Sequence, residues 1–309
     1  VVRIARQTQG RPVTLMWTRE QDVRHDFYRP AVVSRYRAAL DEAGSPLAVH
    51  ARVAAPSVSS FQGRQQRIPD PFVVGGALDR LYGIENKRVD YAEITTPVPL
   101  GFWRAVARSH NGFICESFID EFAHLAGRDP LEFRLDLLGG HDRATAVLEK
   151  AAAEAGWGRR LGPNRGMGVA FSSGFGSFNA QIAEVSVDDG LLRIDRITCV
   201  FDCGLLIDPE TVRAQMEGGI IDGLSAALFS KVTIADGAVE QGNFDDYPFI
   251  RLSQVPEITV HLLSGDGPIG GVGEAAVPAI APAVANAVFA AAGKRIRKLP
   301  MLDEGLRIA

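Results

Sequence analysis

The chain has little cysteine and no strong excess of charge of either sign. Its 309 residues include 3 cysteines and carry a formal net charge of −4, with a pI of about 5.9. An odd number of cysteines at irregular spacing predicts neither a disulfide framework nor a zinc site. A slightly acidic chain also lacks the basic surface that nucleic acids require, so we expect no nucleic-acid partner.

Long apolar runs are also missing. A transmembrane helix needs about 20 consecutive, mainly apolar residues, and no run in this sequence reaches that length. The longest candidate, residues 275–292, is rich in Ala and Pro and is followed by four basic residues between 294 and 298. Positive charges near the C-terminal end of a helix are favoured by the helix dipole. The segment is therefore predicted to be a buried helix, in a chain with no membrane span.

The sequence begins at Val1 without an initiator Met, and residues 1–9 have a helical pattern. Residues 12–18, PVTLMWT, follow Gly10 and have the composition of a strand. A chain that opens inside a structural unit is expected to be a fragment, a processed product or one part of a split protein. Targeting information would then lie in the missing part, so the compartment, cytoplasmic or periplasmic, stays open.

Hydrophobic residues make up 46% of the chain, which is enough for a large core. In the first half, Phe113, Phe118, Phe122 and Leu125 form an apolar stripe at helical spacing. Asp129 precedes a proline and is a suitable N-cap for the next helix. The ranges expected in this half are 32–56 for a hairpin around DEAGSP, 57–90 for a loop that lies against a partner, and 111–138 and 143–156 for helices.

From residue 166 the pattern changes to alternating strands, and Asp189-Gly190 is a strong signal for a tight hairpin turn. A boundary near residue 160 therefore divides the chain into two expected lobes, 1–160 and 161–309. We expect a mixed α/β fold of twisted sheets flanked by helices, with a site at the junction. The other expected elements are a helix at 209–229, a hairpin at 236–237, a strand at 257–263 and the final helix.

The first candidate site is GFWRAVARSHNGFICESFIDE, residues 101–121. Arg104 and Arg108 fall between an expected strand end and a helix for which Ser109 or Asn111 is a suitable cap. Free N–H groups at a helix N-terminus bind anionic or strongly polar ligands. Residue types alone favour a simpler interpretation, an ordinary loop with two surface arginines.

The second candidate site is CVFDCGLLIDPETVRAQMEGGIIDG, residues 199–223. Asp208 begins a helix in which Gln215 stands about two turns from the start, and a side-chain amide both donates and accepts hydrogen bonds. Glycines that share or adjoin one face of this helix allow another backbone or a flat ligand to approach closely; they are Gly218, Gly219 and Gly223. Residue types alone favour plain helix–sheet packing at these glycines, and Cys199 and Cys203 are expected in the core.

The third candidate is Glu274 in GGVGEAAVP, a single carboxylate between glycines and small apolar residues. It precedes a helix whose first turn is expected at 277–281, so it is a candidate helix cap. An apolar environment also raises the pKa of a carboxyl group, as a general base working near neutrality requires. Residue types leave both interpretations open. The six histidines are scattered without metal-ligand spacing.

Four stretches, residues 17–31, 101–138, 202–229 and 270–300, together resemble the molybdenum hydroxylase (xanthine dehydrogenase) family. They are most similar to the molybdopterin-binding large subunit of isoquinoline 1-oxidoreductase and its aldehyde dehydrogenase-like relatives. The resemblance runs nearly end to end and implies the two-lobed mixed α/β fold of that subunit. It also implies that an N-heteroaromatic ring is hydroxylated, or an aldehyde oxidised, with water as the source of oxygen.

The resemblance assigns roles to residues at matching positions. Glu274 matches the glutamate of the GVGE-type loop that takes a proton beside the molybdenum. Arg104 and Gln215 match residues close to the cofactor. The resemblance implies cofactor-binding positions at Arg104, Ala105, Gln215, Gly271, Val272 and Gly273. It implies no protein ligand to the metal, which is held by a pterin dithiolene, here expected as molybdopterin in its cytosine dinucleotide form.

The sequence departs from the family at several points. Asp208 stands where the family usually has Asn, and nothing matches the glycine-rich FGGGFGRR-type loop or the MGQG-type pterin-binding loops. The chain therefore resembles the C-terminal portion of a catalytic subunit, inactive when isolated. We expect it to need an upstream molybdopterin-binding portion, to associate readily, and to pass electrons to a small subunit with [2Fe–2S] clusters, because each cluster needs four cysteines. The alternative is a non-catalytic assembly domain that binds no cofactor.

Overall fold

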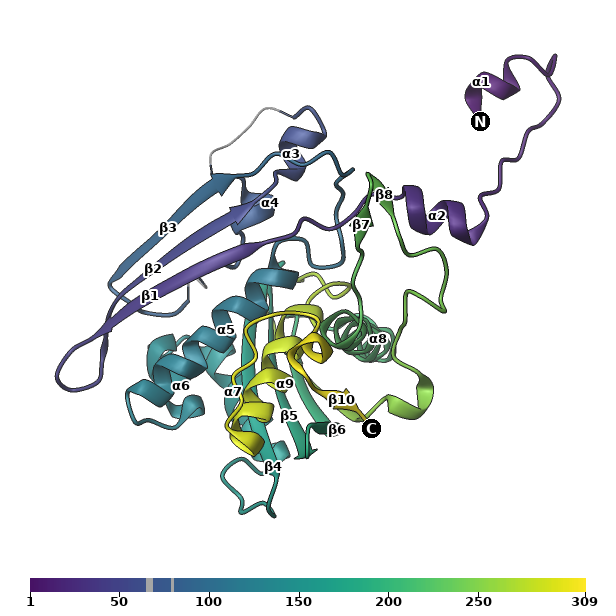
Figure 1. The fold of residues 1–309 in the computed structure, drawn as a ribbon. Helices are drawn as coiled ribbons and strands as arrows, with labels where there is room; N and C mark the ends of the chain where they lie inside the picture. The colour runs from purple at the N-terminus through teal and green to yellow at the C-terminus, as the bar shows by residue number, and fades with distance from the viewer. Residues whose placement is uncertain (65–68, 79–80) are drawn as a thin grey trace.

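The computed structural model describes residues 1–64, 69–78 and 81–309. The chain begins with an arm that extends away from the body and contains two short helices, α1 (Val2–Ala5) and α2 (Arg19–His25) (Figure 1). A capping box at Thr18 starts α2. Between these helices, Leu15, Met16 and Trp17 are exposed and belong to no strand.

A three-stranded sheet follows the arm, in the order β1-β2-β3. Strands β1 (Val33–Leu40) and β2 (Pro46–Ala55) form the expected antiparallel hairpin, and β3 (Asn86–Glu93) pairs with β2 in parallel. The segment between β2 and β3 includes two short helices, α3 (Val58–Phe61) and α4 (Pro71–Val74). The expected loop over 57–90 is therefore wrong in part, and its residues 65–68 and 79–80 lie outside the described residues.

Three consecutive helices link this sheet to the larger one. They are α5 (Arg108–Leu125), α6 (Pro130–Leu138) and α7 (Asp142–Ala155). The Asp129 carboxylate accepts hydrogen bonds from the first turn of α6, and α7 ends at a left-handed Gly156, so both helices begin and end where local chemistry predicts. Phe113 and Phe122 of the apolar stripe are buried, but Leu125 is 76% exposed and its predicted place in the stripe is wrong.

The larger sheet contains five strands in the order β10-β6-β5-β4, and β9 also pairs with β6. An Asp189-Gly190 turn joins β5 to β6, as predicted. The helices that follow are α8 (Pro209–Leu228) and α9 (Val277–Ala292). The strands and remaining short elements are β4 (Arg165–Gly174), β5 (Ser177–Asp188), β6 (Leu191–Asp202), β7 (Ile234–Ala235), β8 (Ala238–Val239), η1 (Leu252–Gln254), β9 (Glu257–Leu263), η2 (Met301–Glu304) and β10 (Arg307–Ile308).

Helix α9 lies across the larger sheet, and helices α5 and α8 pack against it (Figure 1). Its neighbours approach so closely that they need glycine. A Cβ atom at Gly168 of β4 would lie 2.2 Å from the Ala287 amide nitrogen, and one at Gly112 of α5 would lie 2.6 Å from the Pro278 carbonyl oxygen. A Cβ atom at Gly223 of α8 would lie 2.3 Å from a side-chain carbon of α9. Helix α9 therefore touches three elements at nearly backbone distance.

Two main groups of buried hydrophobic residues cover the two faces of this sheet. Ile197 and Cys199 of β6 belong to a group with α8 and α9, whereas Ile182 of β5 and Val200 of β6 belong to a group with α5, α6 and α7. The prediction that the structure is mixed α and β is confirmed, and Cys199 and Cys203 lie in the core as expected. The boundary near residue 160 stays a prediction.

The predicted strand at 12–18 is wrong, and the helix predicted at 1–9 is confined to α1. A strand needs a neighbour for its backbone hydrogen bonds, and this segment lies on the arm, away from both main sheets. Among the helices in the described parts of the chain, none has the length and apolar character needed to cross a membrane.

Candidate active site

Arg104 joins the three candidate stretches of the sequence. Its Nε atom donates to the carbonyl oxygen of Gly273 at 2.6 Å. One terminal nitrogen donates to Oε1 of Gln215 at 2.9 Å, and the other donates to the Asp222 carboxylate at 2.6 Å. A planar guanidinium offers five N–H donors in a fixed fork. The loop before α5, the middle of α8 and the loop before α9 therefore meet at one side chain.

The backbone next to Arg104 has an unusual conformation. Ala105 and Val106 have φ angles of 72° and 50°, in the left-handed region that non-glycine residues rarely adopt. Ala105 is fully buried, and the Val106 amide donates to the Trp103 carbonyl oxygen at 2.8 Å. Each such residue costs on the order of 1–3 kcal/mol and often occurs at a functional site. This tight turn directs Arg104 toward α8 and α9 while α5 starts immediately after it.

The loop before α9 is held at its start by the β4–β5 hairpin. The Gly271 amide donates to the Phe175 carbonyl oxygen at 2.7 Å, and the Ser177 hydroxyl donates to the Gly271 carbonyl oxygen at 2.7 Å. A Cβ atom at Gly270 would lie 2.2 Å from Oγ of Ser177, so only glycine fits there. With Arg104 bound to Gly273, the loop is fixed at both ends. No pattern in the sequence indicated the contribution of Phe175 and Ser177.

Glu274 stands between this fixed loop and α9. The N-cap of α9 is Ala276, without a side-chain cap, so the interpretation of Glu274 as a helix cap is wrong. Its side chain is partly buried, and within the described residues its carboxylate has neither a hydrogen bond nor an ion pair. Ala275 and Ala276 beside it are buried. The backbone beside Glu274 is thus held in place, and the carboxylate is left available to a ligand.

A cleft of about 750 Å³ is lined in part by Phe175 and Ser177, the two residues that hold the start of this loop. It is lined by Ala105 and Val106 on one side and by Phe175 to Phe178 of the β4–β5 hairpin on another. These walls are continuous with the loop of Glu274, because Arg104 binds Gly273 and Phe175 binds Gly271. Most of the other described lining residues are apolar and come from α4 and the segment after it. The size and apolar lining suit a small organic molecule.

The predictions for the helix starts at this site have mixed outcomes. Neither Ser109 nor Asn111 caps α5, which begins at Arg108 after Ala107 and has no side-chain cap. Asp208 caps α8, as predicted, by accepting from the Glu210 and Thr211 amides. Asp222, the ion-pair partner of Arg104, was missed, although it lies one helical turn beyond Gly218 in a stretch already singled out.

The other residues assigned by resemblance lie in or next to this arrangement. Gln215 and Gly273 contact Arg104, and a Cβ atom at Gly273 would lie 3.9 Å from Oε1 of Gln215. Gly271 is exposed, and Val272 is partly buried against the core. Their role in binding a cofactor stays a prediction. Among the residues that the structure describes, no three or more His, Cys, Asp or Glu side chains gather as a metal site.

A second arginine–carboxylate cluster is centred on the middle of α5, and its charged residues do not line the cleft. Glu116 is 2% exposed and accepts hydrogen bonds from Nε of Arg134 at 2.9 Å, the Phe171 amide at 2.9 Å and the Tyr82 hydroxyl at 2.7 Å. Burial raises the pKa of the Glu116 carboxyl, and the charge of Arg134 opposes that rise. For Arg134, burial acts to lower the pKa of the guanidinium, but Glu116 outweighs this effect and raises it.

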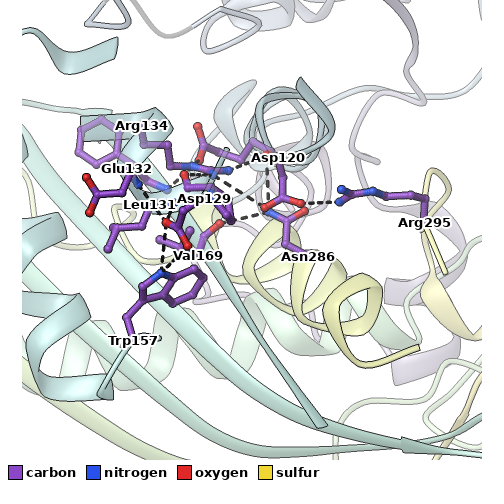
Figure 2. A network of polar contacts seen from close by, with 12 residues as sticks. Asp120, Asp129, Leu131, Glu132, Arg134, Trp157, Val169, Asn286 and Arg295 are labelled. Atoms are coloured by element: carbon purple, nitrogen blue, oxygen red, sulfur yellow. Dashed lines mark hydrogen bonds and ion pairs between the residues drawn. The ribbon is translucent and has the colours of Figure 1, made fainter. Parts of the chain in front are cut away.

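This cluster extends across several elements (Figure 2). Arg134 also donates to the Pro130 and Glu116 carbonyl oxygens, at 2.9 and 2.8 Å. Asp120 accepts from Arg295 at 2.5 Å, and Asn286 of α9 donates to the Val169 carbonyl oxygen at 3.1 Å. The network thus connects α5, α6, β4 and α9, and a carboxylate with this many donors serves packing rather than chemistry.

Two family models, both described as a molybdopterin cofactor-binding domain, match the chain. One matches residues 1–137 and the other residues 147–256. Together they cover most of the chain and include Arg104 and Gln215. Glu274 lies beyond the second matched range.

Known proteins are similar over nearly the whole chain. Isoquinoline 1-oxidoreductase subunit beta of Brevundimonas diminuta is 34% identical over 94% of this chain and 38% of its own length. The membrane-bound aldehyde dehydrogenase (pyrroloquinoline-quinone) of Gluconacetobacter polyoxogenes is 30% identical over 94% of this chain and 42% of its own length. The chain therefore spans about two fifths of the length of these relatives.

A solved structure shares the fold. Quinoline 2-oxidoreductase from Pseudomonas putida 86 superposes with a TM-score of 0.81, covering 96% of this chain and 64% of that one at 14% sequence identity. Because the identity is so low, this similarity concerns the fold alone.

Proposed function

The chain belongs to the molybdopterin-binding xanthine dehydrogenase family, and we propose that it forms the part of a molybdenum hydroxylase catalytic subunit that carries the general base. The observation that supports this most strongly is the arrangement around Arg104. It fixes the loop of Glu274 beside a cleft and leaves that carboxylate without a partner in the described structure. The proposed reaction adds oxygen from water to an electrophilic carbon of an N-heteroaromatic ring or an aldehyde.

The residues present suit a molybdenum–pterin group. The metal in such a group is bound by the pterin dithiolene, so the protein needs to supply orientation and electrostatics rather than ligands. The described site has these features: an available carboxylate at Glu274, an amide at Gln215 and a loop at 270–273 in which Gly270 leaves no room for a side chain. When bound, the group accepts the two electrons removed from the substrate carbon.

Each residue then has a role that its position allows. Glu274 takes the proton that is released as water-derived oxygen attacks the substrate carbon. Arg104 holds the Gly273 carbonyl and the Gln215 amide oxygen, so the Gln215 side chain would be kept in place beside a bound cofactor. Ala105, Gly271 and Val272, which adjoin Arg104 and Gly273 in the chain, would contact the cofactor by shape. A general base positioned in this way contributes roughly 10²- to 10⁴-fold to the rate.

The proposed assembly has further parts. The cofactor is molybdopterin in its cytosine dinucleotide form, held jointly with an upstream molybdopterin-binding portion. Electrons leave through a small subunit with [2Fe–2S] clusters, because this sequence has three cysteines and each cluster needs four. The exposed apolar residues of the arm, Leu15, Met16 and Trp17, are suitable for contact with such a partner.

Glu274→Gln in the assembled holoenzyme tests the role of the base. The amide has the same shape but takes up no proton, so kcat falls by about 10²-fold or more, while molybdenum and pterin contents per subunit stay at wild-type values. The measurements are steady-state kinetics with an N-heteroaromatic and an aldehyde, metal analysis, and release of the pterin nucleotide. The holoenzyme is also assayed for bound pyrroloquinoline quinone, which the name of the similar aldehyde dehydrogenase of Gluconacetobacter polyoxogenes includes.

A matched control is Glu257→Gln, at an exposed glutamate at the start of β9. It leaves kcat and cofactor content unchanged. Full activity of Glu274→Gln would remove Glu274 from the mechanism. Absence of molybdenum from the wild-type holoenzyme would overturn the enzyme proposal and favour an assembly domain without cofactor.

A further inference from the structure

Arg108 is the one ionisable side chain among the described residues that line the cleft. It is the first residue of α5 and is partly buried. Its neighbours in the lining are mainly apolar, including Phe72, Val74 and Leu78. A positive charge in a mostly apolar cleft attracts an anionic group of a ligand more strongly than the same charge in open solvent.

Two glycines make room for this side chain. A Cβ atom at Gly76 would lie 3.2 Å from Cγ of Arg108, and one at Gly174 would lie 2.7 Å from its Nε. The arginine therefore extends between the segment after α4 and the end of β4, packed closely along its length. Such packing restricts the side chain before any ligand binds, which lowers the entropy lost on binding.

The guanidinium has no acceptor among the described residues. Over residues 1–64, 69–78 and 81–309, Arg108 makes no side-chain hydrogen bond or ion pair. Arg104, four residues earlier, contrasts with it, because all of its contacts are with protein atoms that fix the Glu274 loop. Five unused N–H donors at the wall of an apolar cleft match the planar geometry of a carboxylate.

We propose that the cleft binds an aromatic substrate that carries a carboxylate, and that Arg108 pairs with this carboxylate. The apolar walls contact the ring, and the ion pair sets which edge of the ring faces the loop of Glu274. Arg108 is thus a specificity-determining residue. This inference rests on the proposed function for the reaction that follows binding, but binding can be measured without turnover.

The test uses two ligands of nearly equal shape and different charge, quinoline-4-carboxylate and quinoline-4-carboxamide. Their dissociation constants are measured by equilibrium dialysis with the holoenzyme, without an electron acceptor. The carboxylate binds at least about 10-fold more tightly than the carboxamide. In Arg108→Gln its dissociation constant rises roughly 10- to 100-fold, while that of the carboxamide changes less than about 3-fold. Arg108→Lys retains part of the preference, because it keeps the charge without the planar fork.

Arg37→Gln is the matched control, at an exposed arginine of β1, and leaves both dissociation constants unchanged. If Arg108→Gln unfolds at the same temperature as the wild type, misfolding is excluded as the cause of its weaker binding of the carboxylate. Equal changes for the two ligands, or none, would overturn the inference. Selective binding of the carboxylate without turnover would support the inference and contradict the proposed function. Turnover without selectivity for the charged ligand would support the proposed function and contradict the inference.

Discussion

Glu116 and Glu274 are both glutamates in clusters organised by an arginine, but their surroundings are opposite. Glu116 is almost inaccessible and accepts from Arg134, a backbone amide and a tyrosine hydroxyl. Glu274 is partly accessible, and its arginine, Arg104, binds the backbone beside it instead of its carboxylate. A buried charge must be paired and hydrogen-bonded. A carboxylate that accepts and releases protons must keep its oxygens available.

The difference indicates which cluster serves stability and which serves chemistry. In the Glu116 cluster, substitution leaves a buried charge without a partner, so the folded state loses most. In the Arg104 cluster, substitution shifts a loop at the edge of a cleft, so turnover should respond more than stability. Helix α5 belongs to both regions, since it begins at the cleft and carries Glu116 in its middle.

Arg134→Met breaks the buried pair and is expected to have the largest effect on stability. Removing one partner of a buried ion pair destabilises a protein by about 3–5 kcal/mol. Arg128→Met is the control, because Arg128 pairs with Asp136 at the surface and such pairs contribute about 0–1 kcal/mol. Denaturant unfolding measures both. Equal losses in the two variants would mean that the Glu116 cluster is not what stabilises this region.

His110 lies near the start of α5, between the cleft end of this helix and Glu116. Its burial predicts that the stability of this part of the protein depends on pH. Burial lowers the pKa of its imidazole from 6.5 to about 4, although a hydrogen bond between Nε2 and the Val73 carbonyl oxygen opposes this shift. Below pH of about 6.5 the unfolded chain takes up a proton that the folded chain does not. Stability is therefore lost as the pH falls from about 6.5 to about 4, by about 3 kcal/mol in total.

His110→Gln keeps a donor for Val73 and does not titrate. The unfolding free energies of both proteins are measured at pH 7 and pH 4.5. Between these two pH values the wild type should lose more stability than the variant. Parallel curves for the two proteins would show that His110 is not kept neutral by burial.

Asp222→Asn tests the Arg104 cluster and has the smallest expected effect. The Asp222 side chain is 55% exposed, so its attraction to Arg104 is screened by solvent. Weaker orientation of Arg104 lowers kcat/KM of the holoenzyme about 10-fold, or about 1.4 kcal/mol, with unfolding free energy and molybdenum content nearly unchanged. Glu210→Gln on the exposed side of the same helix has no effect. A loss of stability without a change in kcat/KM would make Asp222 a structural residue.

Local chemistry made much of the fold predictable from the sequence. The N-caps at Asp129 and Asp208 and the left-handed stop at Gly156 correspond to real helix ends because each depends on residues within one turn. The strand predicted at 12–18 failed because strand formation depends on a neighbour, and composition carries no information about that neighbour. For the same reason the parallel pairing of β9 with β6 could not be foreseen.

The candidate site shows a similar division. Residue types alone left Arg104 as a surface arginine and Glu274 between two interpretations, and the family resemblance grouped them. The partners that fix their geometry, Asp222 and Phe175, lie 118 residues after Arg104 and 96 residues before Gly271 respectively. Contacts at such separations follow from the packing of α8 and of the β4–β5 hairpin, which no local pattern encodes.

The glycine contacts of α9 have a consequence for how accurately Glu274 is placed. Gly112 and Gly168 bring α9 against the backbones of α5 and β4, and Gly223 brings the backbone of α8 against Ile280 of α9. Backbone atoms have no rotamers to adjust, so sliding or rotation of α9 would collide with neighbours that cannot yield. The backbone of Glu274, three residues before the helix, is therefore placed by close contacts of α9 that leave the helix little room to shift, while its side chain stays free to turn toward a ligand.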